Sequence, residues 1–251
     1  MRYLLTFCMA LSAMVGCSGQ DHEPVLLPMP QEVAWTKGTF HGREVNLCGE
    51  SSVTGIVRSW LDETGVKCSE SAAKRLEVKL VERIDRAVVN QEEAYRLTVS
   101  PKSIRIEAVT EKGGYWAVQT LRQLAETERH GVRIPCCEIT DWPAFRIRGF
   151  MHDTGRSFID PEEIKHEIEV LSRYKINTFH WHLTENQAWR LESKRYPQLN
   201  LSENMTRHQG RFYTCEQVRD ILDFCHRHQV MLIPEIDMPG HSAAFVRTFG
   251  C

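Results

Sequence analysis

The second half of the chain alternates between short apolar stretches typical of strands and longer stretches with the periodicity of helices. Strands are predicted at 146–152, 178–183 and 230–236. The first helix begins near Asp160, where a proline and two glutamates follow, and the next begins at Thr214, which forms a capping-box pattern with Gln217. The third strand is apolar on both faces, as expected where helices cover both sides of a parallel sheet. This order of elements predicts parallel βα units.

Polar side chains follow each predicted strand at the point where the strand ends. They are Asp153 and Arg156 after the first strand, His182 and Glu185 after the second, and Glu235, Asp237 and His241 at the third. Because the carboxyl ends of parallel strands meet at one edge of a sheet, we expect a functional site there. The segment after Glu185 continues to about Arg211 without clear periodicity, whereas a βα connection usually takes about 2–6 residues, which indicates a functional insertion.

Two interpretations of His180-Trp181-His182 are open. Residues two apart on a strand point to the same face, so the two imidazoles could bind a metal ion at the mouth of a barrel, with the acids at the strand ends as further ligands, as in a metal-dependent hydrolase. Alternatively, the histidines are hydrogen-bonding supports, and carboxylic acids carry out the proton transfer. An isolated pair of this kind is a weak signal, and we expect no metal.

Residues 24–141 have a mixed pattern typical of a small α+β domain. Helical periodicity covers 51–63, and a second helix is expected to begin at Gly113. Alternating apolar and polar residues predict strands at 76–80, 95–99 and 103–107, of which the last two form a hairpin. No cluster of reactive side chains is evident here, so we expect a packing role. Asp141-Trp142-Pro143 marks the boundary, and 145–251 form the second domain.

Basic and acidic side chains nearly balance, with 31 against 33 in 251 residues and a net charge of −2, so nucleic acid is a poor candidate partner. Residues 1–17 contain an apolar run too short to span a bilayer. They resemble a bacterial lipoprotein signal in which Gly16 precedes the lipidated Cys17; a plain secretory signal is the alternative. The chain is therefore predicted to be exported, as an outer-membrane lipoprotein or into the periplasm, with no membrane contact beyond the anchor at Cys17.

Nine cysteines include Cys8 and Cys17 of this segment, which leaves seven in the remaining chain. An odd number without close paired spacing is not a disulfide framework, and Cys136-Cys137 has no second pair with which to form a zinc site. We therefore expect mostly buried free thiols.

Three longer motifs surround the predicted strand ends: RGFMHDTGR from Arg148, KINTFHWHLTENQAWR from Lys175 and IPEIDMPGH from Ile233. In this order they resemble glycoside hydrolase family 20, the β-N-acetylhexosaminidases, and the resemblance covers roughly 24–251. It implies a small α+β domain followed by the first strands and helices of an incomplete (β/α)8 TIM barrel. It also implies release of terminal N-acetylglucosamine or N-acetylgalactosamine from glycans with retained configuration and without a cofactor. In this substrate-assisted reaction the acetamido oxygen of the sugar attacks the anomeric carbon.

The resemblance assigns roles residue by residue. Arg156 is implied to bind sugar hydroxyls at the deepest subsite, together with Asp153 and His182, because a guanidinium can donate two parallel hydrogen bonds. A salt bridge to Asp153 is the alternative role of Arg156. Glu185 stands where most members have aspartate, and with His241 it implies a carboxylate–imidazole chain that orients the catalytic acid. The extra methylene of Glu185 is expected to shift that chain by ~1 Å.

The family's acetamido-holding aspartate and general-acid glutamate form an adjacent pair after the fourth barrel strand. The only Asp-Glu dipeptide here is Asp62-Glu63, in the first predicted helix. A complete barrel takes ~250 residues, whereas residues 146–251 hold three predicted strands. We therefore expect a truncated chain that is inactive and poorly stable by itself. A carbohydrate-binding surface lipoprotein without catalysis is the alternative to an enzyme.

Overall fold

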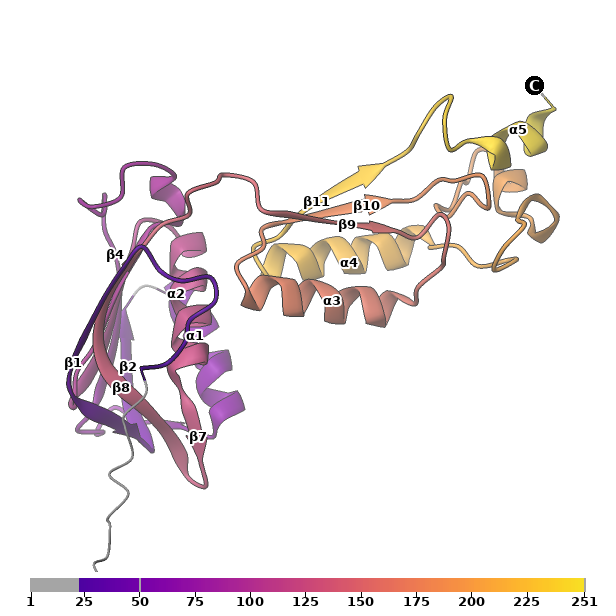
Figure 1. Ribbon diagram of the computed structural model, residues 1–251. Helices are drawn as coiled ribbons and strands as arrows, with labels where there is room; N and C mark the ends of the chain where they lie inside the picture. The colour runs from indigo at the N-terminus through magenta and orange to yellow at the C-terminus, as the bar shows by residue number, and fades with distance from the viewer. Residues whose placement is uncertain (1–22, 50, 251) are drawn as a thin grey trace, which may run out of the picture.

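A mixed sheet of eight strands forms the first part of the computed structural model, which describes residues 23–49 and 51–250. The strand order is β1–β8–β5–β6–β4–β2–β3, with β7 paired to β8. The strands are β1 (Glu32–Gly42), β2 (Glu44–Gly49), β3 (Lys67–Cys68), β4 (Arg75–Leu80), β5 (Tyr95–Val99), β6 (Ser103–Ala108), β7 (Glu126–Glu128) and β8 (Gly131–Asp141). Helices α1 (Ser51–Thr64) and α2 (Glu111–Leu124) cover one face of this sheet (Figure 1).

The helices and the predicted hairpin follow from the residue pattern. Val53, Val57 and Leu61 of α1 are fully buried, since positions four apart share one face of a helix. The hairpin of β5 and β6 is confirmed as an antiparallel pair. The prediction that the second helix begins at Gly113 was wrong: Thr110 caps the helix by accepting hydrogen bonds from the amides of Lys112 and Gly113, so α2 begins at Glu111.

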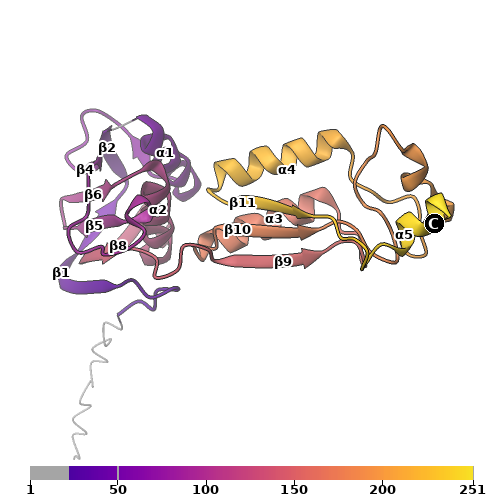
Figure 2. The ribbon, with the colours of Figure 1, turned by 90° about the horizontal axis from the view of Figure 1, so that it is seen from above.

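The second part of the structure is a parallel sheet of three strands in the order β11–β10–β9, which is seen from above in Figure 2. Its elements are β9 (Gly149–Asp153), α3 (Pro161–Arg173), β10 (Thr178–His182), the one-turn 3-10 helices η2 (Pro197–Asn200) and η3 (Ser202–Asn204), α4 (Cys215–Arg227), β11 (Met231–Glu235) and α5 (Ala243–Phe249). The predicted βα units are therefore confirmed. A further one-turn helix, η1 (Gln91–Glu93), precedes β5.

Helices α3 and α4 cover one face of the parallel sheet, and both pack on Phe179 and Trp181 of β10 (Figure 1). The prediction that helices would cover both faces of the third strand was wrong. Met231 and Ile233 of β11 point to the opposite face and are exposed, because α4 packs only on the other side of the strand. Strands β9 and β11 form the two edges of this sheet among the described residues.

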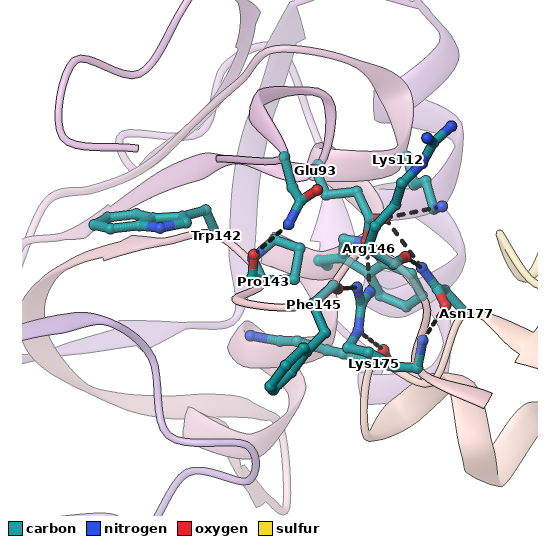
Figure 3. A network of polar contacts seen from close by, with 12 residues as sticks. Glu93, Lys112, Trp142, Pro143, Phe145, Arg146, Lys175 and Asn177 are labelled. Atoms are coloured by element: carbon teal, nitrogen blue, oxygen red, sulfur yellow. Dashed lines mark hydrogen bonds and ion pairs between the residues drawn. The ribbon is translucent and has the colours of Figure 1, made fainter. Parts of the chain in front are cut away.

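A buried polar network joins the two parts at the amino ends of β9 and β10 (Figure 3). The carboxylate of Glu93 is 2% exposed and accepts hydrogen bonds from Trp116 at 2.7 Å, Arg148 at 2.5 Å and Asn177 at 3.1 Å. Burial raises the pKa of Glu93, but the cations of Arg148 and Lys112 together lower it by more, so the net pKa lies below its ordinary value. This network fixes the base of the parallel sheet against the first domain.

The predicted signal segment, including Cys17, lies outside the described residues. The six cysteines that the structure describes are free thiols, of which Cys136, Cys137 and Cys225 are buried. No helix in the described ranges is both long enough and apolar enough to cross a membrane.

Candidate active site

The carboxyl ends of the three parallel strands place an acid, a histidine and an acid side by side. Asp153 of β9 lies beside His182 of β10, which in turn lies beside Glu235 of β11. These residues point to the face of the sheet that α3 and α4 leave uncovered, because they alternate with the core residue Trp181 and its neighbours in register. The register between the strands therefore places these three side chains in one row at the edge of the sheet.

Arg156 lies in the turn after β9 and forms ion pairs with two acids. Its Nη1 is 2.7 Å from Oδ2 of Asp153, and its Nη2 is 2.5 Å from Oε1 of Glu185. The backbone amide of Arg156 also donates to Oδ1 of Asp153 at 3.0 Å, which holds the turn. The predicted alternative, a salt bridge to Asp153, is thus present, yet half of the Arg156 side chain remains exposed and can meet a ligand.

Glu185 is the buried centre of the contacts, with its side chain 1% exposed. Its Oε1 accepts a hydrogen bond from Nδ1 of His241, and its Oε2 accepts one from the backbone amide of Asn186. Burial raises the pKa of Glu185, but the amide of Asn186, His241 and Arg156 outweigh it, so the net pKa lies below the usual value. Glu185 is therefore an ionised carboxylate, and in spite of its extra methylene it contacts the side chains of both Arg156 and His241.

The loop after β11 brings His241 to this carboxylate. His241 has a φ of 50°, a left-handed conformation that is uncommon for residues other than glycine. The amide of Asp237 donates to Oγ1 of Thr184 at 3.0 Å, and the amide of Ala243 donates to the side chain of Asn186 at 3.2 Å. These contacts join the loops after β10 and β11, and they hold His241 in place.

His180 and His182 occupy different environments although both point to the uncovered face of the sheet. Nε2 of His180 is 2.6 Å from Oε2 of Glu235. His182 is 4% exposed, and its Nδ1 lies 3.5 Å from Asp153 while its Nε2 lies 3.6 Å from Asp237. Asp153, Arg156, His182, Glu185 and His241, the five predicted site residues, therefore belong to one connected set of contacts, and their catalytic and binding roles remain predictions.

Sequence reasoning missed Arg190, which organises the long loop after β10. Arg190 is fully buried and donates hydrogen bonds to backbone carbonyls, and burial lowers its pKa to about 10. The acceptors are the carbonyls of Thr154, Arg207, His208 and Arg211. A single charged residue among apolar neighbours gives no sequence signal of this role, because its partners are main-chain atoms.

Gly155 is a second residue that the sequence did not single out. A Cβ atom at this position would lie 2.8 Å from Cβ of Glu185 and 3.0 Å from the backbone of Thr184. The turn after β9 therefore approaches the start of the next loop closely, and a glycine makes this approach possible. The amides of Thr154 and Gly155 donate to the carbonyl of His182, which fixes the turn against β10.

Two protein-family models match adjacent parts of the chain. Residues 23–142 match glycosyl hydrolase family 20, domain 2, and residues 145–250 match glycosyl hydrolase family 20, catalytic domain. The chain belongs to glycosyl hydrolase family 20, with an α+β domain 2 followed by part of the catalytic domain built on parallel strands.

Curated relatives and solved structures of the family resemble the chain over most of its length. A β-hexosaminidase of Porphyromonas gingivalis is 34% identical across 89% of this chain, and one of Vibrio furnissii is 33% identical across 88%. The exo β-N-acetylglucosaminidase of Vibrio harveyi, solved in complex with N-acetylglucosamine, is 32% identical across 90% of this chain with a TM-score of 0.76. The β-N-acetylhexosaminidase of Bacteroides fragilis is 30% identical across 90% with a TM-score of 0.75.

The chain spans less than half of each of these proteins. It covers 31% of the Porphyromonas gingivalis enzyme, 39% of the Vibrio furnissii enzyme, 38% of the Vibrio harveyi chain and 47% of the Bacteroides fragilis chain.

Proposed function

We propose that these residues form the sugar-binding part of an exo-acting β-N-acetylhexosaminidase, which removes terminal N-acetylhexosamines from glycans with retained configuration. The observation that carries this proposal is the half-exposed side chain of Arg156, whose guanidinium lies between two carboxylates at the carboxyl ends of parallel strands. Such a group can donate parallel hydrogen bonds to neighbouring hydroxyls, and Asp153 beside it can accept from them. N-acetylglucosamine- or N-acetylgalactosamine-terminated glycans are the proposed substrates.

Glu185 and His241 are proposed to support proton transfer rather than to attack the sugar. An ionised Glu185 accepts a hydrogen bond from Nδ1 of His241, which fixes the orientation of this imidazole for contact with the group that acts as catalytic acid. In the proposed reaction the acetamido oxygen of the substrate attacks the anomeric carbon, and no nucleophile is needed from the protein. The hydrogen-bonded chain would therefore orient and tune the general acid.

The acid chemistry itself is proposed to require an Asp-Glu pair that these 251 residues do not supply. Asp62-Glu63, the only such dipeptide in the sequence, lies in α1, and Glu63 forms an ion pair with Arg122 of α2. We therefore expect the chain to bind an N-acetylhexosamine but not to hydrolyse a glycoside.

Two measurements on the chain test this proposal. Titration calorimetry with N-acetylglucosamine should show binding that Arg156→Ala weakens at least tenfold and Arg156→Lys weakens less, because lysine keeps the charge without the fork of donors. Arg58→Ala, at an exposed position on α1, is the control and should bind like the parent. A chromogenic N-acetylglucosaminide should not be turned over above buffer. Equal binding by all variants would refute the proposal that Arg156 binds the sugar. Turnover would refute the proposal that hydrolysis needs an Asp-Glu pair that this sequence lacks.

Export with a lipid on Cys17 is the proposed localisation. It rests on the apolar run that ends at Gly16-Cys17. The lipid would place the sugar site at a bacterial membrane surface, where it would meet extracellular or periplasmic glycans.

A further inference from the structure

One nitrogen of the buried His182 ring has no hydrogen-bond partner among the described residues. Nε2 of His182 is inaccessible to solvent, and the nearest acid, Oδ2 of Asp237, lies 3.6 Å away. A buried imidazole nitrogen without a partner is costly, because it loses hydrogen bonds to water and gains none from the protein. This nitrogen is therefore free to bind a ligand.

Two carboxylates face the same point from the neighbouring strand end. Three possible ligand atoms, one each from His182, Glu235 and Asp237, lie within 4.8 Å of one another. One imidazole nitrogen and two carboxylate oxygens are ligands that Zn²⁺ accepts, with a water molecule in the fourth position. We propose that His182, Glu235 and Asp237 form a binding site for a first-row divalent cation, and that Zn²⁺ is the ion it fits best.

Groups beside His182 and Glu235 lie where the partners of metal ligands are found. Asp153 lies 3.5 Å from Nδ1 of His182, on the side opposite to Nε2, so a hydrogen bond there would leave Nε2 as the donor atom to the metal. Nε2 of His180 lies 2.6 Å from Oε2 of Glu235 and contacts that oxygen of the carboxylate. The histidine ligand His182 therefore has an acid beside it, and the acid ligand Glu235 has a histidine beside it.

The distances require only a small adjustment on binding. Tetrahedral bonds of about 2.0–2.2 Å place ligand atoms roughly 3.4 Å apart, so the carboxylates must move inward by about 1 Å. Both carboxylates can move, because the side chains of Glu235 and Asp237 are each more than a quarter exposed. The buried His182 supplies the fixed point of the site.

This site keeps one histidine and two strand-end acids of the metal site considered from the sequence but does not use His180, and it extends beyond the proposed function. His180 is engaged by Glu235 and serves as a support rather than as a ligand. Zn²⁺ and a sugar would compete for His182, so the cation would act as an inhibitor of sugar binding. The inference does not depend on the sugar site, since Zn²⁺ binding is measured without sugar.

Titration calorimetry of the reduced 251-residue chain with Zn²⁺ alone tests the inference. We expect one high-affinity equivalent in the parent, and at least tenfold weaker binding at that site in His182→Ala and in Asp237→Asn. The second substitution is isosteric at a partly exposed position, so it keeps the test valid if His182→Ala fails to fold. His166→Ala, on α3 with a side chain that is 76% exposed, is the control and should bind like the parent.

Cobalt substitution separates this site from adventitious binding by cysteine. The Co²⁺ form should show the spectrum of a nitrogen- and oxygen-ligated ion without a thiolate charge-transfer band. Absence of a high-affinity equivalent in the parent, undiminished affinity in a folded Asp237→Asn variant, or a thiolate band that accounts for the bound ion would each overturn the inference.

Discussion

Lys175 forms a buried ion pair between the two domains, and its removal should strongly destabilise the protein. Its Nζ lies 2.7 Å from Oδ2 of Asp141 and 2.8 Å from the hydroxyl of Tyr95. Burial lowers the pKa of Lys175, while Asp141 opposes this shift. Lys175→Met would leave the carboxylate of Asp141 buried without a cation.

The expected loss follows from what remains around Asp141. Removing one partner of a buried pair costs about 3–5 kcal/mol. Asp141 keeps two hydrogen bonds, from Tyr95 at 3.0 Å and from the amide of Gln31 at 3.1 Å, so the lower end of the range, about 3 kcal/mol, applies. With a urea m-value of about 2–3 kcal/mol/M, the midpoint of unfolding should fall by about 1–1.5 M.

Urea unfolding followed by tryptophan fluorescence and by circular dichroism measures this loss, provided that the two transitions coincide. Lys79→Met on the exposed face of β4 is the control and should change stability by less than about 0.5 kcal/mol. Lys175→Met combined with Asp141→Leu should recover most of the loss, because neither charge is then buried alone. A single variant as stable as the parent, or a double variant as unstable as the single, would refute this reasoning.

Three further outcomes are expected. Burial lowers the pKa of His228, so protons bind this residue in the unfolded chain first; the contribution of His228 to stability should be constant above about pH 6.5 and fall as the pH drops from there toward its folded-state pKa. The fall in the urea midpoint between pH 7 and pH 5 should be smaller in His228→Phe than in the parent, and this difference isolates the contribution of His228. Gly155→Ala should weaken N-acetylglucosamine binding about tenfold in calorimetry by displacing Glu185, whereas Gly240→Ala, with open space around its Cβ position, should not. Cys17→Ala should abolish incorporation of a labelled fatty acid in a bacterial host; labelling that persists would refute the lipid anchor.

The parallel half of the fold was predictable because short apolar runs, helical periodicity and helix-capping chemistry leave strong local patterns. The capping box at Thr214 is present as predicted, since its two hydrogen bonds depend only on residues three apart. The strands β1, β2, β3, β7 and β8 were not predicted, and two of them show why. A register shift between Trp35 and Thr39 breaks the alternation of β1, and Pro135 lies within β8, where it weakens the strand signal.

The candidate site was predictable as a set of residues but not as a set of contacts. That strand ends share one edge follows from the order of elements, whereas the row Asp153–His182–Glu235 depends on the register between strands, which no local pattern encodes. The partners of Arg190 are main-chain carbonyls of a loop without periodicity. Interactions of this kind become visible only when the chain is folded.

The residues that join the two domains and the residues of the candidate site lie at opposite ends of the same two strands, β9 and β10. Arg148 and Asn177 contact Glu93 just before β9 and β10 begin, whereas Asp153 and His182 end these strands at the site. Each strand has five residues, and a rise of about 3.3 Å per residue separates the two ends by roughly 15 Å. Substitutions that far apart without shared partners act independently. Folded Lys175→Met should therefore bind N-acetylglucosamine like the parent, and weaker binding by that variant would show that the junction controls the geometry of the site.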